Sequence, residues 1–149
     1  MHTNTGRELP GHLVALCGRA MAKDLNQRLA TLGLSVGQWG ALFSLSQNDG
    51  MTQTQLADAL SVEQPSMAST LKRLEADGLI RRKPHLTDRR SSTIHLTARA
   101  RKQLPSIVEQ VHATNSHALK GLTRAEIGEF KRLLRVVISN ASDPDPLLP

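Results

Sequence analysis

Apolar residues recur at steps of three to five positions over residues 8–32, which is the spacing of an amphipathic helix. The residues that carry this pattern are Leu9, Leu13, Leu16, Ala20, Leu25, Leu29 and Leu32. Gly33 is expected to end the helix, because glycine readily adopts the conformation that closes a helix C-terminus. A second helix is predicted from Ser35, because Ser35 and Gln38 have the spacing of a capping box. Its apolar side consists of Trp39, Leu42, Phe43 and Leu45.

Two more capping-box spacings follow close together, at Thr52 with Gln55 and at Ser61 with Gln64. The first predicts a short helix whose inward residues are Leu56, Ala59 and Leu60. The second predicts a helix over residues 62–77 whose inward residues are Met67, Leu71 and Leu74. Two short capped helices separated by a few residues indicate a helix-turn-helix.

Residues 79–83 and 92–96 predict two strands joined by a loop. In the second strand apolar and polar residues alternate, with Ile94 and Leu96 on the buried side. A helix-turn-helix followed by such a hairpin, or wing, places one helix in a DNA major groove and the wing against the flanking backbone. The predicted fold class is therefore mainly α with a small β-hairpin wing (α+β).

Two more helices are predicted after the wing. Thr97 is expected to cap a helix that reaches about His117, and Pro105 predicts that this helix kinks or starts late. Thr123 with Glu126 is expected to cap the last helix. The first and last helices carry more apolar surface than a small winged helix can bury, which favours a homodimer formed through them. The predicted organisation is a single compact domain with a helical dimerisation module, a winged helix-turn-helix unit and a flexible tail, at residues 1–34 with 98–141, 35–97 and 142–149 respectively.

Basic residues are concentrated in one part of the chain. Residues 71–102 contain ten Lys or Arg and three Asp or Glu, whereas the whole chain has a net charge of +6. The rest of the chain is therefore close to neutral. A concentrated basic patch indicates a polyanionic partner, and double-stranded DNA is the partner that fits the predicted motif.

The composition argues against several classes of protein. The sequence has no apolar run near 18 residues, which argues against a membrane span, and its first residues lack the apolar segment of a secretory signal. A single cysteine, Cys17, cannot form an internal disulfide, so the expected location is the cytoplasm, with the nucleoid. We expect no enzyme activity, metal site or cofactor, because the sequence has no nucleophile–base motif, metal-ligand cluster or phosphate-binding loop.

The predicted helix over residues 62–77 has an outward face suited to reading bases. Gln64, near its start, can pair with N6 and N7 of adenine, and the hydroxyls of Ser66 and Ser69 can donate or accept. The basic residues further along suit phosphates or a guanine. The candidate DNA-binding residues on this helix are Gln64, Pro65, Ser66, Ser69, Lys72 and Arg73.

The wing carries a second set of candidates. Arg89 and Arg90 near its tip suit a narrow minor groove, and Asp88 is expected to pair with one of them and hold the turn. Which of the two arginines enters the groove stays open. The basic run 81–83 along the first strand is expected to place at least one residue on a phosphate, with Arg81 as the candidate.

Three segments together resemble the MarR family of bacterial transcription regulators: GLSVGQWGALFSL, MTQTQLADALSVEQPSMASTLKRLEADGLIRRK and TDRRSSTIHLTARA. The resemblance covers about residues 8–140, and LKRLEADGLIRR together with the DRR and LT elements is specific. It implies a homodimer with interlocked first and last helices, two recognition helices in major grooves and wing arginines in flanking minor grooves. It also implies an effector that binds between the dimerisation helices and the DNA-binding unit.

Two hypotheses follow for signal response. The favoured one is a repressor that leaves a pseudo-palindromic operator when a small molecule, aromatic or phenolic, binds near His12, Arg19 and Trp39. The alternative is a winged-helix protein that binds DNA without an effector, as an architectural factor. A redox sensor based on Cys17 is disfavoured: the peroxide-sensing branch of the family has its cysteine near the position of Gly11 and uses tyrosines, which this chain lacks.

Overall fold

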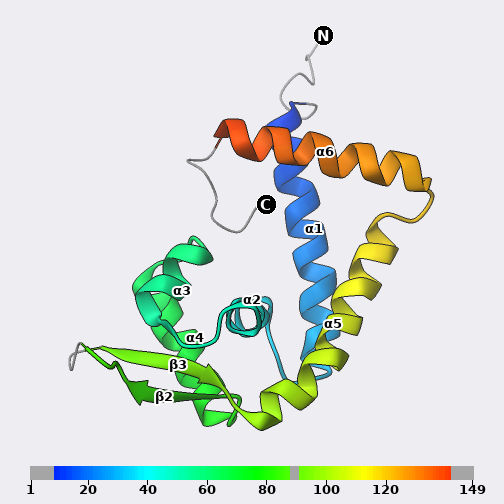
Figure 1. Ribbon diagram of the computed structural model, residues 1–149. Coiled ribbons are helices and arrows are strands. Elements are labelled where there is room, and N and C mark those ends of the chain that lie inside the picture. Colours follow the sequence, from blue (N-terminus) through cyan, green and yellow to red (C-terminus); the bar gives the residue numbers. More distant parts are fainter. Residues whose placement is uncertain (1–8, 88–90, 142–149) are drawn as a thin grey trace. The chain divides into compact units, whose positions relative to one another are not determined.

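The computed structural model describes residues 9–87 and 91–141 (Figure 1). The described residues form two compact units, one up to Asn115 and one from Ser116 onward, and one long helix crosses the boundary between them. The described residues form α1 (Pro10–Ala30), α2 (Val36–Gln47), β1 (Met51–Thr52), α3 (Gln53–Ala59), α4 (Gln64–Ala76), β2 (Ile80–Pro84), β3 (Ser92–Leu96), α5 (Ala98–Ala118) and α6 (Arg124–Ala141). The expected fold class, mainly helical with a small antiparallel sheet, is confirmed.

Three of the four expected capping boxes form. Ser35 opens α2, Thr52 opens α3 and Thr123 opens α6. Each side chain accepts a hydrogen bond from the backbone N–H three positions on, and the Gln or Glu at that position accepts one in return. These reciprocal bonds satisfy N–H groups that have no partner inside the helix, so they fix where each helix begins.

The capping box expected at Ser61 is absent, and α4 begins at Gln64 rather than at residue 62. Ser61 has a φ of +51°, in the left-handed region. The backbone N–H groups of Ser61 and Val62 both donate back to the last turns of α3. Ser61 therefore ends α3 and cannot also cap α4, whose first residue is preceded by an N-cap that makes no side-chain bond. Pro65 lies in the first turn of α4, as predicted.

The wing consists of β2 and β3, and it forms the antiparallel hairpin that the alternating residues predicted. Ile80 pairs with Leu96 at its base, and Arg82 pairs with Ile94 two positions further out. The two-residue strand β1, which the sequence pattern did not predict, pairs with the other edge of β3, so the strand order is β1-β3-β2. Gly50, just before β1, has a φ of +86° and donates its N–H to the Ile94 carbonyl. Through β3 the wing is thus joined to the loop that follows α2.

The core of the first unit is apolar and lies between the end of α1, α2, α3, α4, the sheet and the first half of α5. The three residues expected to face inward on α4 are all buried. In α3 the buried residues are Leu56 and Ala57, whereas Ala59 and Leu60, also expected to face inward, are partly exposed. Leu60 follows the last residue of α3 and still packs against the core from its partly buried position. The buried apolar residues are Leu29, Leu34, Ala41, Leu42, Leu45, Leu56, Ala57, Met67, Leu71, Leu74, Leu79, Ile80, Ile94, Leu96, Ala100 and Ile107.

α5 begins immediately after Thr97, whose Oγ1 accepts a hydrogen bond from the Ala100 N–H. The helix continues through Pro105, so the expectation of a late start is wrong. Proline removes one backbone donor from the second turn, but Ala100 and Ile107 on either side are completely buried and hold the helix against the core.

α1 and α5 run side by side in the first unit (Figure 1). Thr114, which is buried in α5, donates its hydroxyl to Asp24 of α1 at 2.7 Å. Arg28 donates to the same carboxylate oxygen at 2.8 Å. A hydroxyl and a guanidinium thus satisfy one carboxylate between the two helices. Among the described residues, no helix has the length and apolar character required to cross a membrane.

Candidate nucleic-acid interface

α4 has two faces of opposite character. Met67, Leu71 and Leu74 are at most 2% exposed and fix the helix to the core. The opposite face is exposed and carries all six candidates predicted on this helix, Gln64, Pro65, Ser66, Ser69, Lys72 and Arg73. A helix held by one face presents the other in a defined orientation, which base recognition requires.

The side chain of Gln64 is oriented by a contact with the preceding helix. Its Oε1 accepts a hydrogen bond of 3.2 Å from Nε2 of Gln53, at the start of α3. The carbonyl oxygen keeps a second lone pair and the amide keeps both N–H donors, so the group can still pair with a base edge. The two helices of the helix-turn-helix therefore cooperate in placing this amide.

A shallow cavity of about 430 Å³ lies between the start of α2 and the exposed face of α4. Its lining consists of Ser35, Gln38, Pro65, Ser66, Ser69, Thr70 and Arg73, so hydroxyl groups and one guanidinium predominate. The structure thus brings four of the predicted recognition residues together. Sites for small apolar ligands are mostly enclosed and apolar, whereas a hydroxyl-lined hollow with an arginine suits a phosphate oxygen of DNA.

The outer strand of the wing, β2, carries the basic run 81–83, and all three side chains are exposed. Arg82 is engaged with α4, because its Nε lies 3.3 Å from Oε2 of Glu75. This ion pair connects the wing to α4, and Arg81 and Lys83 are then the better candidates for phosphate contacts. Asp88, Arg89 and Arg90 lie outside the described residues, so their roles stay predictions.

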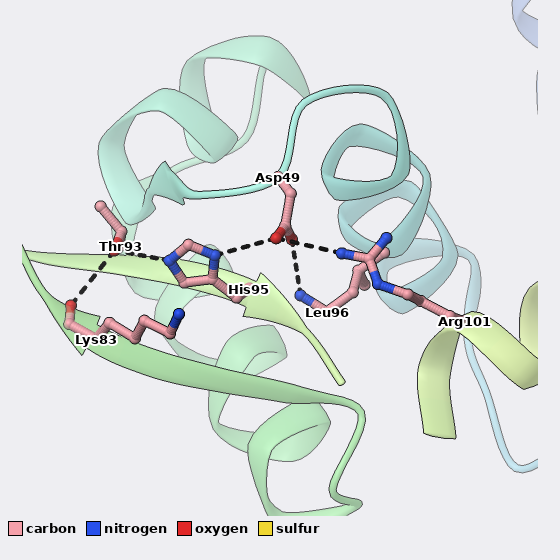
Figure 2. A network of polar contacts seen from close by, with 6 residues as sticks. All are labelled: Asp49, Lys83, Thr93, His95, Leu96 and Arg101. Carbon is pink, nitrogen blue, oxygen red and sulfur yellow. Dashed lines mark hydrogen bonds and ion pairs between the residues drawn. The ribbon is translucent and has the colours of Figure 1, made fainter. Parts of the chain in front are cut away.

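A polar network, which the sequence did not indicate, joins the wing to the loop after α2 and to α5 (Figure 2). At its centre is Asp49, whose carboxylate accepts a backbone hydrogen bond of 2.8 Å from the Leu96 N–H. Nδ1 of His95 lies 3.0 Å from the same carboxylate, and a guanidinium nitrogen of Arg101 lies 3.2 Å from it. Nε2 of His95 lies 2.9 Å from the hydroxyl of Thr93. One acidic residue therefore contacts both a wing strand and α5.

Local sequence gives no sign of this network. The segment Asn48-Asp49-Gly50 predicts only a turn, and Arg101 stands out only as part of the basic stretch. The partners of Asp49 are 46 to 52 positions away in the chain. Only the fold brings them together.

Acidification is expected to remove the stabilisation that ionised Asp49 provides. Partial burial opposes ionisation, but the bonds from Leu96 N–H and His95 and the charge of Arg101 outweigh it and hold the pKa of Asp49 below its usual value. Because the folded-state pKa is the lower one, the stabilisation is present at neutral pH and is lost as the pH falls through that pKa, below about pH 4.

Urea denaturation of the wild type and of Asp49→Asn at pH 7, 5, 4 and 3 checks this expectation. The difference between their free energies of unfolding should be largest at pH 7 and should shrink below about pH 4. Asp58→Asn, which removes an exposed carboxylate from α3, controls for the change in net charge. A difference that does not vary with pH would contradict the prediction.

Comparison with known proteins identifies the family of the winged-helix part of the chain. Residues 34–92 match the model of the MarR family. These residues form a MarR domain. The family expected from the sequence is thereby confirmed for this segment, which contains α2, α3, α4 and most of the wing.

Solved structures extend the similarity of the MarR domain to most of the chain. A crystal structure of MarR is 25% identical, with a TM-score of 0.80 over 89% of this chain and 98% of that one. The transcriptional regulator SlyA is 27% identical, with a TM-score of 0.77 over 86% and 90%. A SlyA-like transcription regulator from Listeria monocytogenes is 28% identical, with a TM-score of 0.79 over 86% and 85%. The chain therefore has the fold of MarR-family transcriptional regulators.

Of the candidate effector residues, Trp39 lies within the MarR domain, and His12 and Arg19 precede it in the chain. His12 and Arg19 are exposed on α1, outside the matched segment. Trp39 is half-buried in α2 and packs against Phe43, with 5.2 Å between ring centroids. Their role in ligand binding stays a prediction. Cys17 is exposed on α1, and its Sγ lies 3.8 Å from the sulfur of Met21.

Within the described part of the chain, no three His, Cys, Asp or Glu side chains are grouped as metal ligands would be.

Proposed function

We propose that the protein is a homodimeric transcription regulator that binds a pseudo-palindromic DNA site, with α4 in the major groove and the wing beside it. The observation that carries this proposal is the division of α4 into a buried apolar face and an exposed face of amide, hydroxyl and basic groups. Such a helix, next to a hairpin with a basic outer strand, has the chemistry of a DNA reader.

Each group on the exposed face has a proposed role. Gln64 and the two serines that follow it on α4 read base edges, because their side chains are short or held by α3 and can approach the groove floor. Lys72 and Arg73 contact phosphates, with Arg73 beside the hollow at the start of α2. Arg81 and Lys83 extend these contacts along the wing.

A second copy of the chain is the proposed partner for the apolar faces of the first and last helices. The exposed apolar residues are Leu13, Val14 and Leu16 on α1, with Leu9 just before it, and Leu133, Val136 and Val137 on α6. Apolar surface on this scale favours association. A two-fold dimer would present two recognition helices to half-sites whose centres are about 10 base pairs apart.

Equilibrium binding tests the proposal. Fluorescence anisotropy is measured with a duplex that contains an inverted repeat from the promoter beside the coding region, and with a scrambled duplex of the same composition. We expect specific binding at least about a thousandfold tighter than to the scrambled duplex, weakening steeply as salt rises. Equal affinity for both duplexes, or affinity independent of salt, would refute sequence-specific regulation.

The response to an effector is a separate part of the proposal. Aromatic carboxylates and phenols are titrated into the preformed complex, with Arg19→Ala as the variant that tests the predicted ligand region. Release of DNA at saturating ligand supports a ligand-responsive repressor. Retention of DNA with every ligand supports the alternative, a winged-helix protein that binds DNA without an effector.

A further inference from the structure

The orientation of the wing is determined at its base. Ile80, Ile94 and Leu96 are at most 3% exposed, and they anchor only the inner half of the hairpin to the core. Further out, Lys83 and Pro84 on β2 are exposed and Ser92 and Thr93 on β3 are only partly buried. A hairpin held by apolar contacts at one end can tilt, so polar contacts that brace it have a large effect on where its outer strand lies.

Asp49 supplies such a brace. Its carboxylate holds β3 at two points, through the backbone of Leu96 and the imidazole of His95. The loop that carries Asp49 fits closely against this ring, because a Cβ built on Gly50 would lie 3.0 Å from Cε1 of His95. The φ of +86° at Gly50 also favours glycine. The loop and the wing strand are therefore in direct contact as well as hydrogen-bonded.

The contacts continue from Asp49 along the wing to its outer strand (Figure 2). Nε2 of His95 meets the Thr93 hydroxyl at 2.9 Å, and this hydroxyl lies 3.5 Å from the carbonyl oxygen of Lys83 on β2. Lys83 and Thr93 are also direct partners in the strand register. These contacts connect Asp49 to the strand that carries the basic residues.

The same carboxylate connects the wing to α5. Arg101 lies in the first turn of α5, and its guanidinium is 3.2 Å from Asp49 Oδ2. Its side chain is 53% exposed, so the pair adds little to stability by itself. The pair matters more for geometry, because with it the wing and α5 both contact the one carboxylate that the loop after α2 carries.

We propose that Asp49 is a positioning residue that holds the wing at the angle needed to contact DNA beside the recognition helix, with His95 and Arg101 as its partners. Asp49 itself does not touch DNA in this arrangement. The inference rests on the proposed function, since the orientation of the wing matters for binding only if the wing contacts DNA. It predicts that disturbing Asp49 removes wing contacts selectively and leaves the contacts of α4 in place.

Two duplexes separate the contributions of α4 and the wing. The short duplex contains only the two half-sites, and the long duplex adds about six base pairs at each end, where the wings reach. For the wild type, the ratio of the two affinities reports the wing contacts, and we expect about tenfold or more in favour of the long duplex. Asp49→Asn should lower this ratio to about one to three while changing affinity for the short duplex less than threefold.

Arg101→Met tests the same inference without disturbing β3, because it removes only the tie to α5 from a largely exposed position. Lys102→Met is the matched control: it removes one charge from the neighbouring position of α5 and leaves Asp49 untouched. We expect Arg101→Met to lower the long-to-short ratio at least twofold and Lys102→Met to keep the wild-type ratio. Hydroxyl-radical footprints should shorten at both ends with Asp49→Asn.

The outcomes distinguish the inference from the function on which it rests. If the wild type binds neither duplex in a salt-dependent way, the proposed function fails. If the wild type prefers the long duplex and both Asp49→Asn and Arg101→Met keep that preference, DNA binding stands and the positioning role of Asp49 is refuted. A lower ratio in both variants, with the Lys102→Met ratio unchanged, supports it.

Discussion

Replacing Arg73 with alanine is expected to weaken binding of the dimer to its specific DNA site by about 2–6 kcal/mol. One arginine contact to DNA contributes about 1–3 kcal/mol, and two-fold symmetry removes the contact from both half-sites at once. Arg73 is exposed on α4 and lines the hollow between this helix and α2, where a phosphate oxygen would lie. The substitution leaves the buried face of α4 intact, so folding should be preserved.

The measurement is anisotropy with the specific duplex at several salt concentrations. A phosphate contact predicts that the slope of log affinity against log salt becomes shallower by about one for each copy of Arg73. A contact to guanine predicts instead a larger loss for the specific duplex than for the scrambled one. Arg124→Ala, which removes the same charge from the first position of α6, is the control for net charge. An unchanged affinity with Arg73→Ala would remove Arg73 from the interface.

Local chemistry explains which features of this fold were predictable. The capping boxes at Ser35, Thr52 and Thr123 depend on residues three positions apart, so their bonds form wherever the helix does. The same spacing at Ser61 failed because the local turn that ends α3 there gives Ser61 a left-handed backbone. A capping pattern therefore predicts a helix start only when the preceding chain is free to adopt the extended conformation that an N-cap requires.

The exposed face of α4 and the contacts of Asp49 differ in how far the sequence predicts them. Helical periodicity with Met67, Leu71 and Leu74 inward determines which residues of α4 face outward, so the exposed set follows from the sequence. The contacts of Asp49 depend instead on β1 pairing with β3, and β1 has only two residues. A strand of that length has no detectable alternation, so sequence patterns do not show that the loop after α2 meets the wing.

Introducing a carboxylate at Val137 is expected to dissociate the proposed dimer. Val137 is 51% exposed and lies on the apolar side of α6, with Phe130, Leu133 and Leu134 at helical spacing around it. In a two-fold interface Val137→Glu places a charge in both copies, and an uncompensated buried charge costs about 3–5 kcal/mol. The dissociation constant of the dimer should therefore rise more than about a hundredfold.

Ser139→Glu is the matched control, because it adds the same charge two positions further along α6, on the polar side of the helix. Sedimentation equilibrium should show a monomer for Val137→Glu and a dimer for Ser139→Glu at the same concentration. DNA binding should follow: a monomer reaches one half-site at a time and loses the contribution of the second, whereas Ser139→Glu keeps the affinity of the wild type. If both variants remain dimeric, the apolar side of α6 does not form the interface, and the spacing of the two recognition helices must be determined by another surface of the chain.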